Sequence, residues 1–283
     1  MKRITLAAAL AFAVSAPAAI LEAGPGMEFE TPSAAARVAK DGDTVAIAAG
    51  EYLGDVCVWN AGNLTIRGAG IGRTVIDADG KSCMGKGIWI VRGANTVIEG
   101  ISFRGAKCAD RNGAGIRLEA DAGFTARSCS FSDCENGILA GALPNATVTV
   151  EKCVFRGNGA GDGYSHNIYI GEVAKFVFAD SVSDHALGGH CLKSRARETI
   201  VRDSVFDDGE DGESSYLVNF PNGGKISLEG CRLVQSPKAP NGTMVSIGEE
   251  GAYPGSVFEK ENCVFVNLRR QGGCEVACGE TRR

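Results

Sequence analysis

The segment TVIEGISFRG, residues 96–105, recurs along the chain in altered form and decides the fold. Its counterparts are FTARSCSFSD from Phe124, VTVEKCVFRG from Val148, FVFADSVSDH from Phe176, TIVRDSVFDD from Thr199, ISLEGCRLVQ from Ile226 and VFEKENCVFVN from Val257. In the alignment one column reads Ile101, Cys129, Cys153, Ser181, Ser204, Cys231 and Cys263, at spacings of 28, 24, 28, 23, 27 and 32 residues. Two residues later a second column reads Phe103, Phe131, Phe155, Ser183, Phe206, Leu233 and Phe265. Repetition at this period indicates a solenoid.

A second short segment recurs in step with the first. It reads GIWI from Gly87, GIRL from Gly115, GILA from Gly137, NIYI from Asn167, CLKS from Cys191 and YLVN from Tyr216. Both segments read as short strands with no amphipathic helix between them, so each repeat is predicted to be one turn of a β-coil. Each column then stacks on itself at the ~4.8 Å spacing of paired strands. The phenylalanines are expected to form a continuous core, and the cysteines and serines a narrow inward-facing ladder.

The cysteines are predicted to have two different roles. The chain has 11 of them, an odd number that cannot all pair within one molecule. Those of the ladder column are expected to be buried, unreactive thiols: Cys129, Cys153, Cys231 and Cys263. The better disulfide candidates lie outside that column, and the sequence leaves their pairing open: Cys83, Cys108, Cys134, Cys274 and Cys278.

The N-terminus and the composition predict an exported protein. Lys2 and Arg3 precede an apolar run, Ile4 to Val14, and a stretch of small residues follows, which is typical of a signal peptide over residues 1–19. The apolar run is too short to span a bilayer of ~30 Å, so no membrane span is expected. The 29 basic residues against 34 acidic ones disfavour a nucleic-acid partner, which requires a basic surface. We expect a periplasmic or secreted monomer.

Two early segments carry a resemblance to a known family. AAARVAKDGDTVAIAAGEY, residues 34–52, and NLTIRGAGIGRTVID, residues 63–77, resemble the first coils of right-handed parallel β-helix proteins of the pectate-lyase-like superfamily. The resemblance implies an all-β, single-domain right-handed parallel β-helix over residues 20–283, with a short N-terminal capping helix. It also implies action on a polysaccharide by β-elimination or hydrolysis, although one fold hosts many functions.

The candidate site comes from two neighbouring repeats, HNIYIGE from His166 and HCLKSRA from His190. Superposition places His166 on His190, Tyr169 on Lys193 and Gly171 on Arg195. Strand alternation points Tyr169, Lys193 and Arg195 outward, and turns inward the residues between them, Ile168, Ile170 and Leu192. The histidines share the inward parity, but they stand at the first residue of the strand, where the preceding turn often breaks it. The same outward positions in earlier coils are expected to hold Trp89, Arg117 and Leu139.

These residue types suit β-elimination of an anionic, uronic-acid polysaccharide. The reaction needs a cation on the carboxylate, a base for the neighbouring C–H and an acid for the leaving oxygen. Arg195 suits the carboxylate, Lys193 or a histidine the base, and Tyr169 or the other histidine the acid. We predict that substrate is bound by Arg117, Arg197, Tyr216 and His185. Tyr216, expected to face outward with Val218, either stacks on a sugar or is an ordinary strand residue. His185 either contacts substrate at the rim of the site or has no role.

Several alternatives stay open at this stage. The histidine pair could form a stacked hydrogen-bonding ladder with no catalytic task. Hydrolysis would need two carboxylates ~5–10 Å apart. The turn FDDGEDGESSY, residues 206–216, offers several, but the chain lacks the motifs of polygalacturonase-type β-helices. That turn is either a solvated loop or a Ca²⁺ site, and no cofactor is otherwise expected. A C5-epimerase and a non-catalytic carbohydrate-binding or exopolysaccharide-assembly module are the remaining classes.

Overall fold

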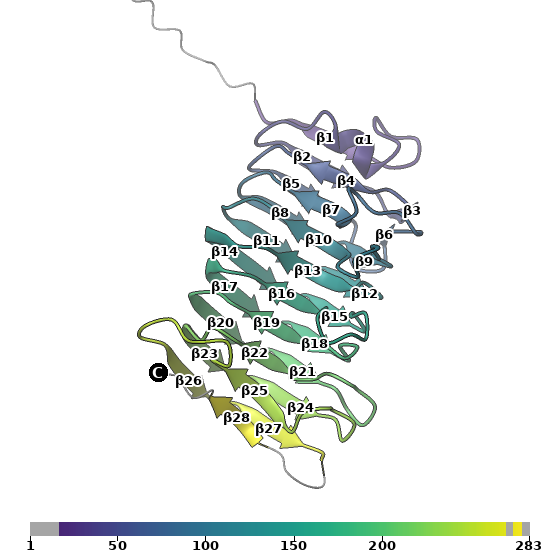
Figure 1. Ribbon diagram of the computed structural model, residues 1–283. Helices are drawn as coiled ribbons and strands as arrows, with labels where there is room; N and C mark the ends of the chain where they lie inside the picture. The colour runs from purple at the N-terminus through teal and green to yellow at the C-terminus, as the bar shows by residue number, and fades with distance from the viewer. Residues whose placement is uncertain (1–16, 270–273, 279–283) are drawn as a thin grey trace, which may run out of the picture.

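The chain folds as a single coil of short parallel strands, shown in Figure 1. The computed structural model describes residues 17–269 and 274–278, so most of the signal peptide predicted for residues 1–19 lies outside the described residues. Each turn of the coil gives one strand to each of three sheets, and every neighbouring pair of strands within a sheet is parallel. The predicted right-handed parallel β-helix is confirmed.

Three sheets, named A, B and C here, form the walls of the coil. Sheet A contains β1 (Ile20–Ala23), β2 (Thr44–Ile47), β5 (Thr65–Arg67), β8 (Thr96–Glu99), β11 (Phe124–Arg127), β14 (Leu143–Glu151), β17 (Val173–Ala179), β20 (Glu198–Arg202), β23 (Lys225–Glu229) and β26 (Val257–Glu261). Sheet B contains β3 (Gly50–Leu53), β6 (Thr74–Asp77), β9 (Ser102–Arg104), β12 (Ser130–Ser132), β15 (Val154–Arg156), β18 (Val182–Asp184), β21 (Val205–Asp207), β24 (Arg232–Gln235) and β27 (Val264–Asn267). Sheet C contains β4 (Cys57–Trp59), β7 (Gly87–Val91), β10 (Ala114–Leu118), β13 (Asn136–Ala140), β16 (Ile168–Ile170), β19 (Leu192–Ser194), β22 (Val218–Phe220), β25 (Thr243–Ile247) and β28 (Cys274–Cys278).

A short helix closes the N-terminal end of the coil, as predicted. Helix α1 (Pro32–Ala36) begins after Thr31, whose hydroxyl accepts a hydrogen bond from the N–H of Ala34 at 3.3 Å. Its alanines Ala35 and Ala36 are buried against the first coil. No helix among residues 17–269 and 274–278 is long and apolar enough to cross a membrane.

The predicted phenylalanine column forms the centre of the core. The rings of Phe103, Phe131 and Phe155 are fully buried and stack with centroids 5.2 and 4.6 Å apart. The next rung carries Ser183 instead of a phenylalanine, and the ring of Phe178 from β17 lies there, 6.2 Å from Phe155. The aromatic core is therefore continuous although one rung of the column is polar.

The predicted ladder of small side chains has a specific hydrogen-bonding task. The backbone N–H of Cys129 donates to the sulfur of Cys153 at 3.4 Å, and the N–H of Cys153 donates to the hydroxyl of Ser181 at 3.0 Å. Each ladder residue follows a left-handed residue, such as Lys152 or Asp180, with φ near 50°. The turn leaves the backbone N–H of the ladder residue buried. The ladder side chain of the next coil accepts a hydrogen bond from this N–H, and both a thiol and a hydroxyl can do so, which explains why serine replaces cysteine in this column.

The predictions for cysteine are partly wrong. Cys129, Cys153 and Cys231 are buried free thiols as expected, and burial raises the pKa of Cys231 to about 12. Cys263 is a free thiol too, but it is only partly buried, contrary to the prediction. Cys83, Cys108 and Cys134 were disulfide candidates, yet all described cysteine side chains are free thiols. Cys134 is buried and bonds the carbonyl of Ser132, so it has no need of a covalent partner. The side chains of Cys274 and Cys278 lie outside the described residues.

Candidate functional site

The strands of sheet C begin with a break in alternation that turns the histidines outward. Asn167 and Cys191, which would face outward by strict alternation, are fully buried. The amide of Asn167 donates to the hydroxyl of Ser183 at 3.1 Å, and that hydroxyl donates to the carbonyl of Cys191 at 2.7 Å. The preceding residues, His166 and His190, therefore lie on the outer side of the wall.

The two histidines and Tyr216 form a stacked ladder. Nδ1 of His166 accepts the N–H of His190 at 3.0 Å, and Nδ1 of His190 accepts the N–H of Tyr216 at 3.2 Å. The two histidine rings stack with centroids 4.6 Å apart, and the rings of His190 and Tyr216 lie tilted to each other with centroids 5.0 Å apart. Position 189 must be glycine here, because a Cβ would lie 1.9 Å from the carbonyl oxygen of Ser165. The two histidines thus form the stacked hydrogen-bonding ladder that the sequence left open as an alternative.

Both imidazoles are held in the neutral state. Burial and the neighbouring His190 and Lys193 keep the pKa of His166 well below its ordinary value. Burial and Lys193 lower the pKa of His190 to about 3. Since each Nδ1 accepts a backbone N–H, the single ring proton of each neutral imidazole is on Nε2. Each histidine can then donate a hydrogen bond from Nε2, but cannot accept one there.

Polar side chains stand in register on the outer face of sheet C. Tyr169 pairs with Lys193, and Leu139 pairs with both Tyr169 and Arg117, so these four residues form one outer column. Arg195 follows two residues after Lys193, and its Nε donates to the Tyr169 hydroxyl at 3.0 Å. The ring of His166 stacks beside that of Tyr169, with centroids 5.7 Å apart.

These side chains surround a hollow of about 320 Å³. Its lining residues are Asn112, Arg117, Asn136, Leu139, Gly141, Tyr164, His166, Tyr169, Lys193 and Arg195. Three of them are cationic and none is a carboxylate. Arg117, unlike Lys193 and Arg195, is in no ion pair with a carboxylate of the described residues. The hollow therefore presents positive charge, amide and phenol groups to a ligand.

Sequence reasoning missed the partner of the two cations, Glu250. Its carboxylate lies 2.7 Å from Nη1 of Arg195 and 3.6 Å from Nζ of Lys193. It comes from the loop after β25, far along the chain from either cation, and no pattern in the sequence links them. The bond from Arg195 lowers the pKa of Glu250, against the effect of burial. Burial and Arg195 lower the pKa of Lys193, although Glu250 opposes this.

Three predicted binding residues do not line the hollow. Arg197 is exposed and lies over the ring of Tyr253, 5.3 Å from its centroid. His185 follows β18 and pairs with Asp184 at 3.1 Å. Tyr216 ends the histidine ladder. The hollow thus contains the predicted catalytic residues other than His190 but, of the four predicted binding residues, only Arg117.

Two predicted outward positions are wrong by one residue. Ile90, not Trp89, pairs with Arg117, and Trp89 is buried edge-on against Phe103 with centroids 4.9 Å apart. Val218 pairs with Leu192 and faces the core, so Asn219 stands beside Lys193. A shift of one residue exchanges the two faces of a strand, and the apolar segment around Trp89 has no polar residue that would fix its register from sequence.

The acidic turn after β21 is held by structural contacts. Asp208 is fully buried and accepts the N–H groups of His185 at 2.7 Å and Ser214 at 3.0 Å. Asp211 is exposed and pairs with Lys238 at 2.9 Å. Within the described residues no cluster of three or more histidine, cysteine, aspartate or glutamate side chains could hold a metal ion. Calcium binding by this turn stays a prediction.

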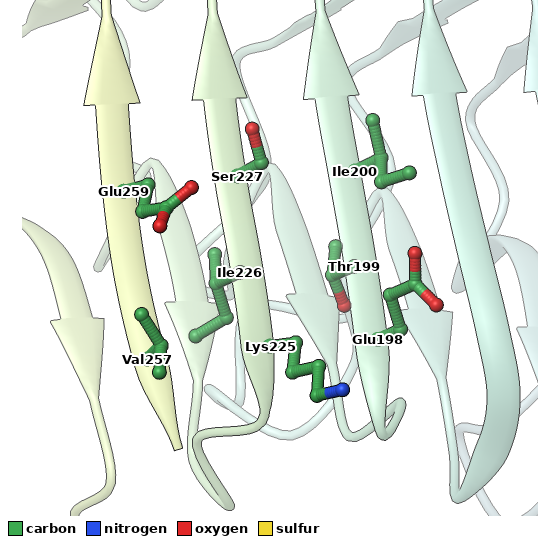
Figure 2. A pocket seen from close by; sticks show the side chains of 8 residues that line it. All are labelled: Glu198, Thr199, Ile200, Lys225, Ile226, Ser227, Val257 and Glu259. Carbon is green, nitrogen blue, oxygen red and sulfur yellow. The ribbon is translucent and has the colours of Figure 1, made fainter. Parts of the chain in front are cut away.

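A second hollow, of about 290 Å³, lies on the outer face of sheet A. Figure 2 shows Glu198 and Glu259 on the two strands that flank the strand carrying Lys225. Glu198 is already paired with Lys175 at 2.8 Å. The strand that carries Lys225 lies between these two carboxylates (Figure 2).

The family follows from the sequence of the coil itself. Residues 54–206, more than half of the chain, match the family model described as right handed beta helix region. The chain therefore belongs to the right-handed β-helix family. No curated protein matches it in sequence.

Solved structures with the same fold cover nearly the whole chain. A pectin methylesterase from Aspergillus niger superposes with a TM-score of 0.60 at 13% identity, covering 93% of this chain and 94% of its own. The pectin methylesterase PemA from Erwinia chrysanthemi gives 0.59 at 10% identity, covering 94% of each chain. The pectate lyase Pel9A gives 0.57 at 12% identity, covering 91% of this chain and 81% of its own. At such identities the likeness shows the fold alone.

Proposed function

We propose that this protein is exported and cleaves an anionic, uronic-acid polysaccharide by β-elimination. The observation that carries the proposal is the hollow on sheet C, which combines Arg117, Lys193 and Tyr169 and is lined by no carboxylate. Proteins of this fold named pectin methylesterase and pectate lyase support a polymer of this class as substrate. Export, predicted from residues 1–19, suits a polymer met outside the cytoplasm.

The cation that neutralises the substrate carboxylate is Arg117 in this proposal. The guanidinium of Arg195 already donates to Tyr169, to Asn222 at 2.6 Å and to Glu250 at 2.9 Å, so it has no free pair of donors. Arg117 keeps its planar fork for a bidentate contact with a carboxylate. Neutralising that carboxylate makes the neighbouring C–H acidic enough to lose a proton.

The base is Lys193. Burial and Arg195 lower its pKa, which increases the fraction of neutral amine available to accept a proton. Neither histidine suits this role, because Nδ1 is occupied by a backbone N–H and Nε2 already carries the ring proton.

The acid is Tyr169. Its hydroxyl oxygen accepts the Nε–H of Arg195, so its own proton is free to be donated into the hollow that the ring lines. Transfer of that proton to the glycosidic oxygen completes the cleavage. His166, which stacks beside Tyr169, supplies a second N–H donor for the substrate.

Hydrolysis is less well supported. It needs a pair of carboxylates ~5–10 Å apart around the bond that breaks. No aspartate or glutamate lines the hollow on sheet C, and Glu250 is held by Arg195 and Lys193.

The test follows the unsaturated sugar that β-elimination creates. Pure protein is incubated with a panel of uronic-acid polymers, and the ultraviolet absorbance of the product is recorded. We expect a rise with at least one polymer, and a rate lower by ~10²-fold or more in Lys193→Ala. Lys225→Ala, which changes an exposed lysine of sheet A, serves as the matched control and should retain the rate.

Other outcomes identify the competing functions. Binding of a polymer with no rise in absorbance would favour a carbohydrate-binding or assembly module. Changed proton NMR signals of the polymer without new chain ends would favour a C5-epimerase. New reducing ends without an unsaturated sugar would favour a hydrolase.

A further inference from the structure

The side-chain amide of Asn219 is fully buried, and its oxygen has no hydrogen bond. Asn219 lies on β22, and the loop of residues 248–256 is attached next to it by hydrogen bonds to the carbonyls of Phe220 and Pro221, at 2.9 and 3.0 Å. Its Nδ2 donates to the Glu249 carboxylate of this loop, but no described residue donates to its Oδ1. Because a buried polar atom without a partner is costly and rare, this oxygen calls for a physical explanation.

The loop fixes the orientation of this amide. Glu249 accepts one hydrogen bond from Nδ2 of Asn219 and another, at 3.0 Å, from the hydroxyl of Ser246. A carboxylate offers only acceptors, so the amide must turn its NH₂ group toward Glu249 and cannot flip to present its oxygen there. Oδ1 of Asn219 is therefore kept available as an acceptor for another group.

Of the two in-register neighbours of Asn219, Lys193 of β19 and Ser246 of β25, only Lys193 can still donate to this oxygen. The single hydroxyl proton of Ser246 is given to Glu249. The amine of Lys193 has donors to spare, because the Glu250 carboxylate at 3.6 Å is beyond hydrogen-bond distance and Nζ donates to no other described residue. The free acceptor and the free donor thus lie on adjacent strands whose backbones are ~4.8 Å apart.

We propose that Asn219 is a positioning residue that accepts a hydrogen bond from the ammonium group of Lys193 after proton transfer. The catalytic consequence rests on the proposed function, whereas the contact itself does not. When the neutral amine takes the substrate proton, the C–H electrons form the new double bond, and the C–O bond breaks as its oxygen takes the proton of Tyr169. Nζ then carries one more N–H, and Oδ1 of Asn219 accepts it inside the protein. The ammonium is drawn away from the hollow, which disfavours return of the proton to the substrate carbon.

Several charged or titratable groups also face Lys193. They are Arg195 on the same strand, Tyr169 on β16, His166 and His190 in the turns, Arg117 in the same hollow, and Glu249 and Glu250 of the loop. Burial and Arg195 lower the pKa of Lys193, while Glu250 and Glu249 oppose this. An uncharged acceptor stabilises only the ammonium form, so loss of Oδ1 should lower the pKa of Lys193 further.

The pH–rate profile on the active polymer tests the proposal. Asn219→Leu removes the oxygen but keeps the branched shape of the side chain, and the base-dependent limb should move to lower pH by about one unit or more. The carboxylate that this change releases, Glu249, can only move the limb upward, so a downward shift identifies the lost oxygen. Asn219→Thr should return the limb toward its wild-type position, because a hydroxyl can donate to Glu249, as that of Ser246 does, and still accept from Lys193. A limb that stays in place or moves up in Asn219→Leu would overturn the inference and leave β-elimination standing.

Chemical labelling gives a readout that does not depend on catalysis. The reaction of Lys193 with an amine reagent, followed by peptide mass spectrometry across a pH series, gives the pH at which half of the amine has lost its proton. This midpoint should fall by about one unit in Asn219→Leu, while that of the exposed Lys225 in the same sample stays unchanged. Equal Lys193 midpoints in the wild-type protein and the variant would show the inference to be wrong, even where no polymer is cleaved.

Crystal structures of the wild-type protein at low and high pH cover the case in which Asn219→Leu does not fold. Below the midpoint, Nζ of Lys193 should lie within ~3.2 Å of Oδ1 of Asn219, and above it the two atoms should separate. An Nζ that stays beyond this distance at low pH would refute the contact.

Discussion

Replacement of His190 tests whether this residue is structural, as part of the histidine ladder, or catalytic. His190→Ala removes the acceptor of the Tyr216 N–H and the two ring contacts to His166 and Tyr216. An unsatisfied buried N–H costs ~1–3 kcal/mol, and each aromatic contact contributes ~0.5–1.5 kcal/mol. Because Tyr216 is only half-buried, water replaces part of the lost acceptor, and we expect a total destabilisation of about 2–4 kcal/mol.

The chain itself supplies the matched rescue variant. Asn136 occupies the same column one coil before His166, and its side-chain oxygen accepts the N–H of His166 at 3.0 Å. His190→Asn should therefore restore the acceptor, although not the ring contacts, and recover ~1 kcal/mol or more relative to His190→Ala.

Two measurements check this reasoning. Urea unfolding gives the free-energy difference if the slope with denaturant is unchanged, and hydrogen exchange at the Tyr216 amide reports the local bond. We expect fast exchange in His190→Ala and slow exchange in His190→Asn, with elimination activity retained in the asparagine variant. Equal stability and equal exchange in the two variants would refute the ladder, and loss of activity in a stable His190→Asn would make His190 catalytic.

Three further predictions follow from the same contacts. His190 should contribute a loss of stability of ~1.4 kcal/mol per pH unit as pH decreases below about 6.5 toward 3, because it takes up a proton in the unfolded state but not in the folded state, where its pKa is about 3. Acid titration of unfolding should show a slope shallower by about that amount in His190→Asn. Glu250→Gln should move the base-dependent limb of the pH–rate profile to lower pH, since it removes a carboxylate that raises the pKa of Lys193; a limb that stays in place or moves up would contradict Lys193 as base. Cys153→Ser should unfold within ~1 kcal/mol of wild type, whereas Cys153→Val should lose ~1–3 kcal/mol because the N–H of Cys129 loses its acceptor; equal melting curves would count against the ladder.

The parts of the fold that were predicted correctly depend on side chains that repeat in one column. Phe103, Phe131 and Phe155 could be aligned because a ring must stack on a ring in the narrow core, and such a column survives changes in turn length. The partnership of Tyr169 with Lys193 could be derived because both repeats begin with histidine and share the same alternation.

The errors arose where the sequence lacks such a constraint. Trp89 stands in an uninterrupted apolar strand, so alternation of polar and apolar residues could not show that Trp89 faces inward and Ile90 outward. Glu250 was missed because loops between coils differ in length and carry no repeating position. The expected compartment makes the loop cysteines disulfide candidates, whereas the free thiol of Cys134 is explained by burial and a carbonyl acceptor.

The exchange between Ser183 and Phe178 shows how this scaffold can change its chemistry. At the rung of the site, sheet B carries the hydroxyl of Ser183 instead of a phenyl ring, and this hydroxyl is hydrogen-bonded at the start of both β16 and β19. The ring at this rung of the core, that of Phe178, comes from sheet A instead of sheet B. A single coil can therefore be rewritten for a new ligand while the coils above and below keep their packing, which makes each rung a separate unit for protein engineering.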